Sequence, residues 1–149
     1  MSIIFICHGN ICRSPMAEWI FKDMLEKRNI TDITCTSMAV STEEIGNDIY
    51  PPAKKCLASH NIPFEKHSAR QITRIDYEEA DMLICMNESN LRRLSRIIGE
   101  DDENKVYLLM DFTPNKKEIE DPWYTRNFEK VFNEISEGLE GLLNKIMEA

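Results

Sequence analysis

The residues best suited to chemistry stand together near the start of the chain, in the run Cys7-His8-Gly9-Asn10-Ile11-Cys12-Arg13-Ser14. A cysteine thiolate is a strong nucleophile, and an arginine offers paired, planar donors to phosphate oxygens. Gly9 and Asn10 tolerate positive φ, which a tight loop around an anion requires. Ser14 can hydrogen-bond the sulfur of Cys7 and assist its departure. The run therefore predicts attack by Cys7 on a phosphoryl group that Arg13 holds.

The flanking residues place this run between a strand and a helix. The apolar segment 3–6 does not alternate with polar residues, which is typical of a strand covered on both faces. Ser14 and Pro15 suit the N-cap and first position of a helix, and apolar residues at helical spacing extend it to about Arg28 or Asn29. The loop amides and the positive end of this helix form an anion nest, whose field holds Cys7 as a thiolate.

Short apolar runs and helical patterns alternate along the rest of the chain. Further strands are predicted at 33–37, 82–86 and 106–109, and further helices from Pro51, through 91–98 and over 128–146. This alternation indicates a parallel sheet with helices on its faces. A length of 149 residues fits a single domain, residues 1–149. We therefore expect one three-layer α/β domain with a four-stranded parallel sheet and helices on both faces.

Composition narrows the function classes. The chain has 18 basic and 26 acidic residues, a formal charge of −8, which argues against nucleic acid or an anionic membrane as the main partner. The sequence shows neither a run of 18 apolar residues nor a signal-peptide pattern. Five irregularly spaced cysteines fit reduced thiols better than a disulfide framework. The expected location is the cytoplasm, and the expected assembly is a monomer or weak dimer.

The run around Cys7, extended over 6–18, resembles the low-molecular-weight protein tyrosine phosphatases. Similar blocks follow in the family's order at 67–72, 85–90 and 121–124, so the resemblance covers essentially the whole chain. It implies a four-stranded parallel sheet, a tyrosine-phosphorylated protein as substrate, and catalysis without a metal or other cofactor.

The resemblance also implies roles for the residues near 121. A cysteinyl-phosphate mechanism needs a proton donor for the leaving group and later a base for water. Asp121 fills the position of that residue in the family's Asp-Pro-aromatic loop. Trp123 and Tyr124 match the positions that flank the substrate ring. Without the Cys7 loop, Asp121 would be interpreted as a solvated residue that starts a helix.

Further roles implied by the resemblance concern the support of the loop. Ser37 and His67 match positions that hydrogen-bond Asn10 and hold the strained loop conformation. Cys12 lies beside the nucleophile, and the family's chemistry implies a reversible Cys7–Cys12 disulfide that protects Cys7 from overoxidation.

The chain departs from the family pattern around the substrate pocket. His8 stands where the family often has an apolar or small residue, and it can change the charge of the rim. Glu43 and Glu44 stand in the segment where many members have a tryptophan wall. Tyr50 is the aromatic residue nearest in sequence, so we hypothesise that it supplies a substitute wall.

There are three alternatives to a tyrosine phosphatase, and the first two use the same scaffold. Arginine phosphatases carry Thr where this chain has Ile11, and an aliphatic residue leaves the phosphoguanidinium N–H unpaired, which favours phosphotyrosine. A thioredoxin-coupled arsenate reductase needs two further cysteines close together, and no cysteine follows Cys85. A phosphate-binding module without turnover would lack the nucleophile or the acid, whereas Cys7 and Asp121 are both present.

Overall fold

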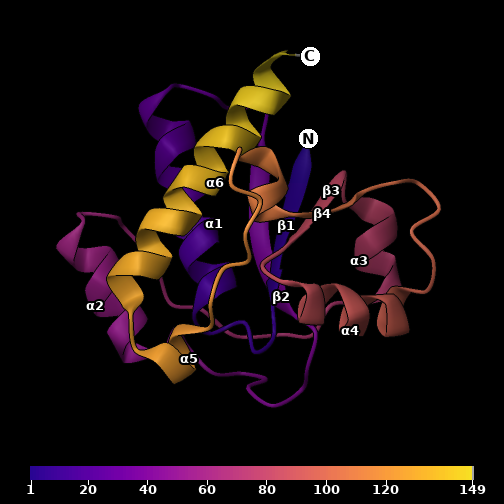
Figure 1. Cartoon of the computed structure of the whole chain (residues 1–149), viewed down its shortest axis with the longest axis horizontal. Coiled ribbons are helices and arrows are strands. Elements are labelled where there is room, and N and C mark those ends of the chain that lie inside the picture. The colour runs from indigo at the N-terminus through magenta and orange to yellow at the C-terminus, as the bar shows by residue number, and fades with distance from the viewer. Residues whose placement is uncertain (149) are drawn as a thin grey trace.

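A computed structural model describes residues 1–148 and contains one four-stranded sheet (Figure 1). The strands are β1 (Ser2–Cys7), β2 (Thr34–Ala39), β3 (Met82–Cys85) and β4 (Val106–Leu108). All three pairs are parallel, in the order β2-β1-β3-β4. The helices are α1 (Arg13–Lys27), α2 (Pro51–Ser59), α3 (Arg74–Glu79), α4 (Glu88–Ile98), η1 (Leu109–Phe112), α5 (Pro122–Thr125) and α6 (Phe128–Glu148).

Two apolar cores lie on opposite faces of the sheet. Ile3 and Phe5 of β1 pack with α1, α2 and α6, whereas Ile4 and Ile6 pack with α3 and α4. Because successive side chains of a strand point to opposite faces, β1 must be apolar on both, which explains its unbroken apolar run. Figure 1 shows the same arrangement, with α1, α2 and α6 on one side and α3 and α4 on the other. The predicted α/β fold class is confirmed.

The order of the strands determines where a ligand can bind. The chain leaves β1 for β2 on one side, and it later returns to β3 on the other side. In open parallel sheets the crevice at the carboxyl ends of two such strands is where ligands bind. The loop after β1, which holds Cys7, lies at this switch point.

The start of α1 differs from the prediction. The helix begins at Arg13 with Cys12 at the N-cap, so Ser14 lies inside the helix. The Ser14 hydroxyl contacts Cys7 and Asn10 instead of capping the backbone. The expected N-cap was therefore wrong, because the side chain that could cap the helix is used in the loop.

Helix α3 was not predicted, although it carries a recognisable start signal. Thr73 and Asp76 form a reciprocal capping box at its first turn. The helix has only six residues, too few to show a helical repeat of apolar positions.

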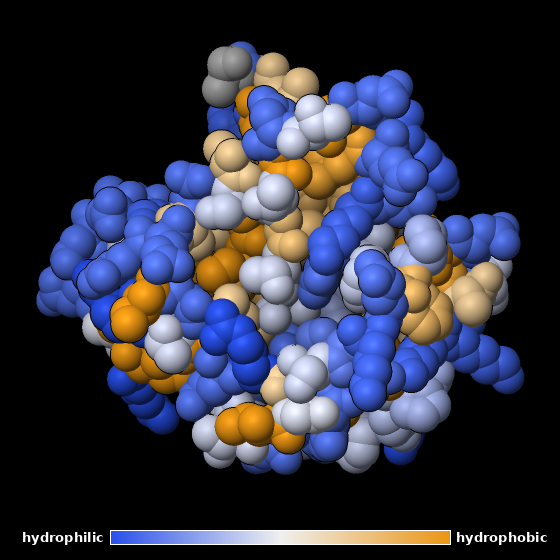
Figure 2. Space-filling view, turned by 180° about the vertical axis from the view of Figure 1, so that it is seen from behind, coloured by the Kyte–Doolittle hydropathy of each residue, from blue (hydrophilic) through white to orange (hydrophobic). Residues whose placement is uncertain are grey.

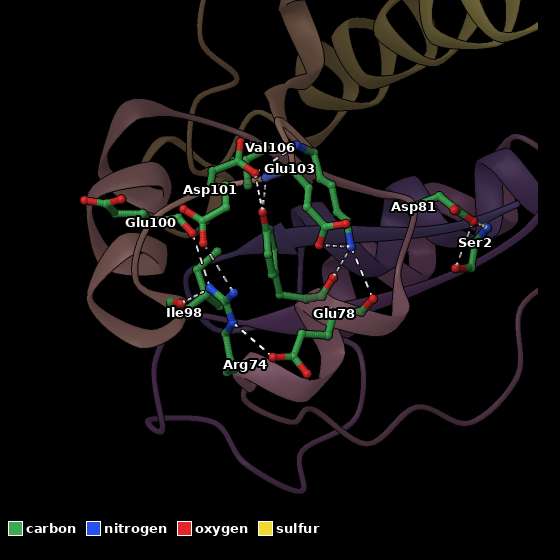
Figure 3. A network of polar contacts seen from close by, with 12 residues as sticks. Ser2, Arg74, Glu78, Asp81, Ile98, Glu100, Asp101, Glu103 and Val106 are labelled. Atoms are coloured by element: carbon green, nitrogen blue, oxygen red, sulfur yellow. Dashed lines mark hydrogen bonds and ion pairs between the residues drawn. The ribbon is translucent and has the colours of Figure 1, made fainter.

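Helix α3 is tied to the loop between α4 and β4 by a polar network (Figure 3). Arg74 donates to the carbonyl oxygens of Ile98, at 2.5 Å, and Glu100, at 3.2 Å, at the end of α4. Asp101 accepts from the Tyr77 hydroxyl at 2.6 Å, and the same hydroxyl accepts from the Glu103 backbone N–H at 3.1 Å. This network holds the segment that leads from α4 into β4. It lies away from the loop after β1.

Replacing Tyr77 with phenylalanine tests this network. Tyr77 is fully buried, so the change leaves the Glu103 N–H without its partner and should destabilise the fold by about 1–3 kcal/mol. The midpoint of urea unfolding measures the loss. Tyr107→Phe is the matched control, because that partly exposed hydroxyl donates only to the Asn104 carbonyl oxygen. Equal stability of Tyr77→Phe and the wild type would contradict the assignment.

The face turned away from the viewer of Figure 1 is mostly hydrophilic, with apolar side chains gathered in separate patches (Figure 2). Within residues 1–148, no helix has the length and apolar character needed to cross a lipid bilayer.

Candidate active site

The loop after β1 turns its carbonyl groups toward the surrounding protein. The carbonyl oxygens of Cys7, His8, Asn10 and Ile11 accept hydrogen bonds from Val40, Ser41, His67 and Tyr50, respectively. Among the described residues, the backbone N–H groups of 9–12 donate to no protein acceptor. A loop whose acceptors are satisfied and whose donors are free is an anion nest, and the first turn of α1 adds its own free N–H groups.

Asn10 holds this loop in shape. Its φ of 62° lies in the left-handed region, which asparagine tolerates better than most residues. Its side chain donates to Ser14 Oγ at 2.9 Å and accepts from the Arg70 N–H at 3.3 Å. His67 Nε2 lies 2.7 Å from the Asn10 carbonyl oxygen, and because a carbonyl only accepts, Nε2 carries the proton. The expected contact between His67 and Asn10 is present.

One expectation about loop support was wrong, and Gly9 does not use its freedom to adopt positive φ. Ser37 does not reach Asn10, because its hydroxyl donates to the buried carboxylate of Glu18 at 2.7 Å. A Cβ at Gly9 would lie 3.2 Å from Cγ of Glu44, so close packing rather than backbone strain explains the glycine.

Cys7 lies at the bottom of the nest, at the end of β1. Its sulfur is buried and lies 3.0 Å from the Ser14 hydroxyl, as the sequence predicted. All five cysteines are free thiols in the structure, so the Cys7–Cys12 disulfide stays a prediction. Burial, together with the charges of Cys7 and Asp121, raises the pKa of Cys12 well above its usual range. Cys12 is therefore protonated at neutral pH and is not a competing nucleophile.

Arg13 and Asp121 meet at the mouth of the nest. The Arg13 side chain is buried, and one guanidinium nitrogen donates to the Ile119 carbonyl oxygen at 3.1 Å. Its other terminal nitrogen lies 3.5 Å from Oδ2 of Asp121. Asp121 is the N-cap of α5, where Oδ1 accepts from the Trp123 N–H at 3.0 Å. One carboxylate oxygen is therefore fixed by the helix cap, and the other faces Arg13.

A pocket opens above Cys7 and brings most of the predicted residues together. Its lining comprises Cys7, His8, Gly9, Ile11, Cys12, Arg13, Glu43, Glu44, Asp121, Trp123 and Tyr124. His8 Nε2 lies 2.8 Å from Oε2 of Glu43, so the two departures from the family pattern are paired with each other. The rim on this side is acidic.

Tyr50 does not line the pocket, so the hypothesis of a substitute wall was wrong. Its ring packs against Trp123 with centroids 4.7 Å apart, and its hydroxyl accepts from Arg126 at 2.6 Å. The Arg126 guanidinium also lies 5.5 Å from the Trp123 ring. Tyr50 and Arg126 therefore support Trp123 from behind, while Trp123 and Tyr124 face the pocket.

Sequence reasoning missed several supporting groups. Arg126 positions Tyr50, the Ile119 carbonyl holds Arg13, and the Arg70 backbone binds Asn10. Glu18 binds Ser37 within the protein. The Ile119 and Arg70 contacts use backbone atoms, which carry no signature in residue type. Arg126 ends α5 in the left-handed region, which an arginine in the sequence does not indicate.

This strand order, with a thiol at the base of an amide nest after the first strand, defines the class of cysteine-dependent phosphatases. Comparison with known proteins gives the particular family. The family model described as low molecular weight phosphotyrosine protein phosphatase matches residues 2–149, and the chain belongs to this family.

Individual relatives are similar to this chain over nearly their full length. The low molecular weight phosphotyrosine protein phosphatase of Rattus norvegicus is 39% identical, over 97% of this chain and 94% of the relative. The crystal structure of YfkJ from Bacillus subtilis has a TM-score of 0.94 at 34% identity and covers 99% of this chain and 95% of that one. The crystal structure of DARP, a Drosophila arginine phosphatase, has a TM-score of 0.90 at 28% identity, with 98% of both chains covered.

Proposed function

We propose that this chain hydrolyses phosphotyrosine in proteins through a cysteinyl-phosphate intermediate. The observation that carries the proposal is the meeting of three groups in one pocket. Cys7 lies at its base, and Arg13 and Asp121 approach within 3.5 Å of each other at its mouth. A nucleophile, an oxyanion binder and a proton donor are the groups that the reaction requires.

In the first step the Cys7 thiolate attacks phosphorus, so a P–S bond forms as the P–O bond to tyrosine breaks. Arg13 and the free N–H groups of the loop bind the equatorial oxygens of the phosphoryl group. These donors are already in place, so they stabilise the negative charge of the transition state without rearranging. Asp121 gives its proton to the leaving phenolate, which departs as tyrosine. The Ser14 hydroxyl, 3.0 Å from the sulfur, positions the thiolate.

In the second step water attacks the phosphocysteine on the side that tyrosine has left. Asp121, now ionised, takes a proton from the water. The P–S bond breaks, Cys7 leaves as a thiolate and inorganic phosphate is released. Ser14 assists this departure by donating a hydrogen bond to the leaving sulfur. The enzyme returns to its starting state without a metal or other cofactor in the reaction.

The pocket walls support an aromatic substrate. Ile11 and the exposed rings of Trp123 and Tyr124 are among the residues that line the pocket. A phenyl ring buries apolar surface against these groups, and the offset stacking of aromatic rings adds to this.

An arginine phosphatase is the second candidate. The likeness to DARP favours it, and so does the acidic rim formed by Glu43 and Glu44, which would attract a guanidinium group. The test is the ratio of kcat/KM for a phosphotyrosine peptide and a phosphoarginine peptide of the same sequence. A ratio well above one supports the proposal. A ratio below one assigns the arginine substrate and keeps the mechanism.

Replacing Ile11 with threonine should shift this ratio toward phosphoarginine by about tenfold or more. The hydroxyl supplies a polar partner for the phosphoguanidinium N–H and removes apolar contact with a phenyl ring. Both peptides are assayed with each variant. Ile75→Thr is the matched control, because Ile75 is exposed on α3 and lies outside the pocket lining. An unchanged ratio in Ile11→Thr would contradict the role of Ile11.

We also propose that the chain acts as one domain in the cytoplasm, as a monomer or weak dimer. Its partner is then a tyrosine-phosphorylated protein rather than nucleic acid or membrane. The formal charge of −8 and the five free thiols support these assignments.

A further inference from the structure

A second cluster of reactive side chains lies outside the active site, between α2 and α6. Cys56 belongs to α2, His60 follows directly after its last residue, and Glu129 lies in the first turn of α6. The two helices pack side by side (Figure 1). One thiol sulfur, one imidazole nitrogen and one carboxylate oxygen lie within 4.8 Å of one another. We propose that these three residues form a binding site for a zinc ion.

Each of the two contacts with Glu129, one to each carboxylate oxygen, is within about 0.6 Å of the separation between two ligands of a metal ion. Ligands about 2.1 and 2.3 Å from a tetrahedral zinc ion lie about 3.6 Å apart. The Cys56 sulfur lies 3.6 Å from Oε1 of Glu129, which matches this separation. His60 Nε2 lies 2.8 Å from Oε2 of Glu129, where two ligands need about 3.4 Å. Because the Glu129 side chain is largely exposed, a small rotation of its carboxylate opens this distance.

The backbone presents the ligands on one face. Cys56 lies near the end of α2, and His60, four residues later, is its C-cap residue, so the two side chains meet on one side of the helix end. The His60 ring stacks on Phe132 of α6 with centroids 3.8 Å apart and planes inclined by 10°. This stacking fixes the plane of the ring and keeps Nε2 directed at Glu129.

The types of ligand atom in this cluster determine which metal ion it would bind. Thiolate together with imidazole suits zinc, whereas calcium and magnesium bind oxygen ligands. Glu129 accepts hydrogen bonds from both Cys56 and His60. The ion would take the place of the two hydrogen atoms in these bonds. The thiol proton would pass to solvent, and neutral His60 would bind through Nε2 with its proton on Nδ1. With three protein ligands and an open side, the fourth position takes water.

Cobalt(II) is the spectroscopic probe, because its bond to a thiolate gives a charge-transfer band in the near ultraviolet. The titration uses the Cys7→Ser/Cys12→Ser background, which removes the active-site thiols and makes binding, not turnover, the readout. We expect one equivalent of cobalt to produce the band and one equivalent of zinc to abolish it. Cys56→Ser should remove the band, whereas Cys35→Ser, at a half-buried thiol elsewhere, should retain it.

Two surface variants keep the test valid if Cys56→Ser is unstable. His60→Gln and Glu129→Gln change partly or largely exposed side chains, and each should weaken zinc binding at least tenfold in competition with a chelating indicator. Glu137→Gln, on the same helix, is the control and should leave the affinity unchanged. The proposal is overturned if zinc does not bind to the background protein, if Cys35→Ser removes the band, or if neither glutamine variant weakens binding.

Discussion

Replacing Cys7 with serine should lower phosphatase turnover by about 10⁴-fold or more while the protein stays folded. The hydroxyl is a far weaker nucleophile than the thiolate, and the covalent step depends on that atom alone. The substitution is nearly isosteric, and the Ser14 hydroxyl, now 3.0 Å from the sulfur, can pair with the new oxygen. The measurement is kcat with a phosphotyrosine peptide.

Two controls separate loss of the nucleophile from loss of the site. Cys35→Ser should keep wild-type turnover, since Cys35 lies on β2 outside the pocket lining. Cys7→Ser itself should still bind inorganic phosphate, because Arg13 and the loop amides remain, and a thermal shift with phosphate detects this. Turnover that persists in Cys7→Ser would place the nucleophile elsewhere. Turnover lost together with phosphate binding would indicate a collapsed loop.

Replacing Asp121 with asparagine should lower kcat by about 10²–10⁴-fold for a poor leaving group such as phenol. Asparagine keeps an oxygen that can cap α5 and accept from the Trp123 N–H, but it carries no proton to transfer. The loss should be much smaller for p-nitrophenyl phosphate, whose leaving group departs without protonation. The comparison of the two substrates is therefore the diagnostic measurement.

An equal loss for both leaving groups would contradict the role of Asp121 as a proton donor. It would assign the carboxylate a structural role beside Arg13, from which it lies 3.5 Å away. Asp102→Asn is the matched control, because Asp102 is exposed and lies at the opposite end of β4 from the pocket. That variant should hydrolyse both substrates at the wild-type rate.

The sequence predicted the core of the site because that core is local. Cys7, Arg13 and Ser14 lie within eight residues, and a buried strand and a helix start frame them. The alternation of strands and helices sufficed to predict a parallel sheet, whereas the strand order β2-β1-β3-β4 was seen only in the structure. Helix α3 was missed because its six residues are too few to show a helical repeat of apolar positions.

The errors arose where distant segments compete for a side chain. Ser37 was expected at Asn10, yet Glu18 from α1 lies closer and takes its hydrogen bond. Tyr50 was placed at the pocket by its proximity in sequence, whereas Trp123 and Arg126 hold its ring outside the lining. Such choices depend on tertiary distances, which neither residue type nor spacing reports.

The carbonyl contacts of the nest have a thermodynamic consequence. Their donors all come from the stretch between β2 and α3: Val40, Ser41, Tyr50 and His67. Local unfolding of this stretch would release the loop and abolish its affinity for phosphate. Linkage then requires the reverse effect, so an anion bound to the loop makes this stretch harder to unfold by the same free energy. The nest and the 40–67 stretch are thus one cooperative unit, and each phosphoryl group bound at Cys7 also stabilises residues outside the pocket lining, such as Tyr50 and His67.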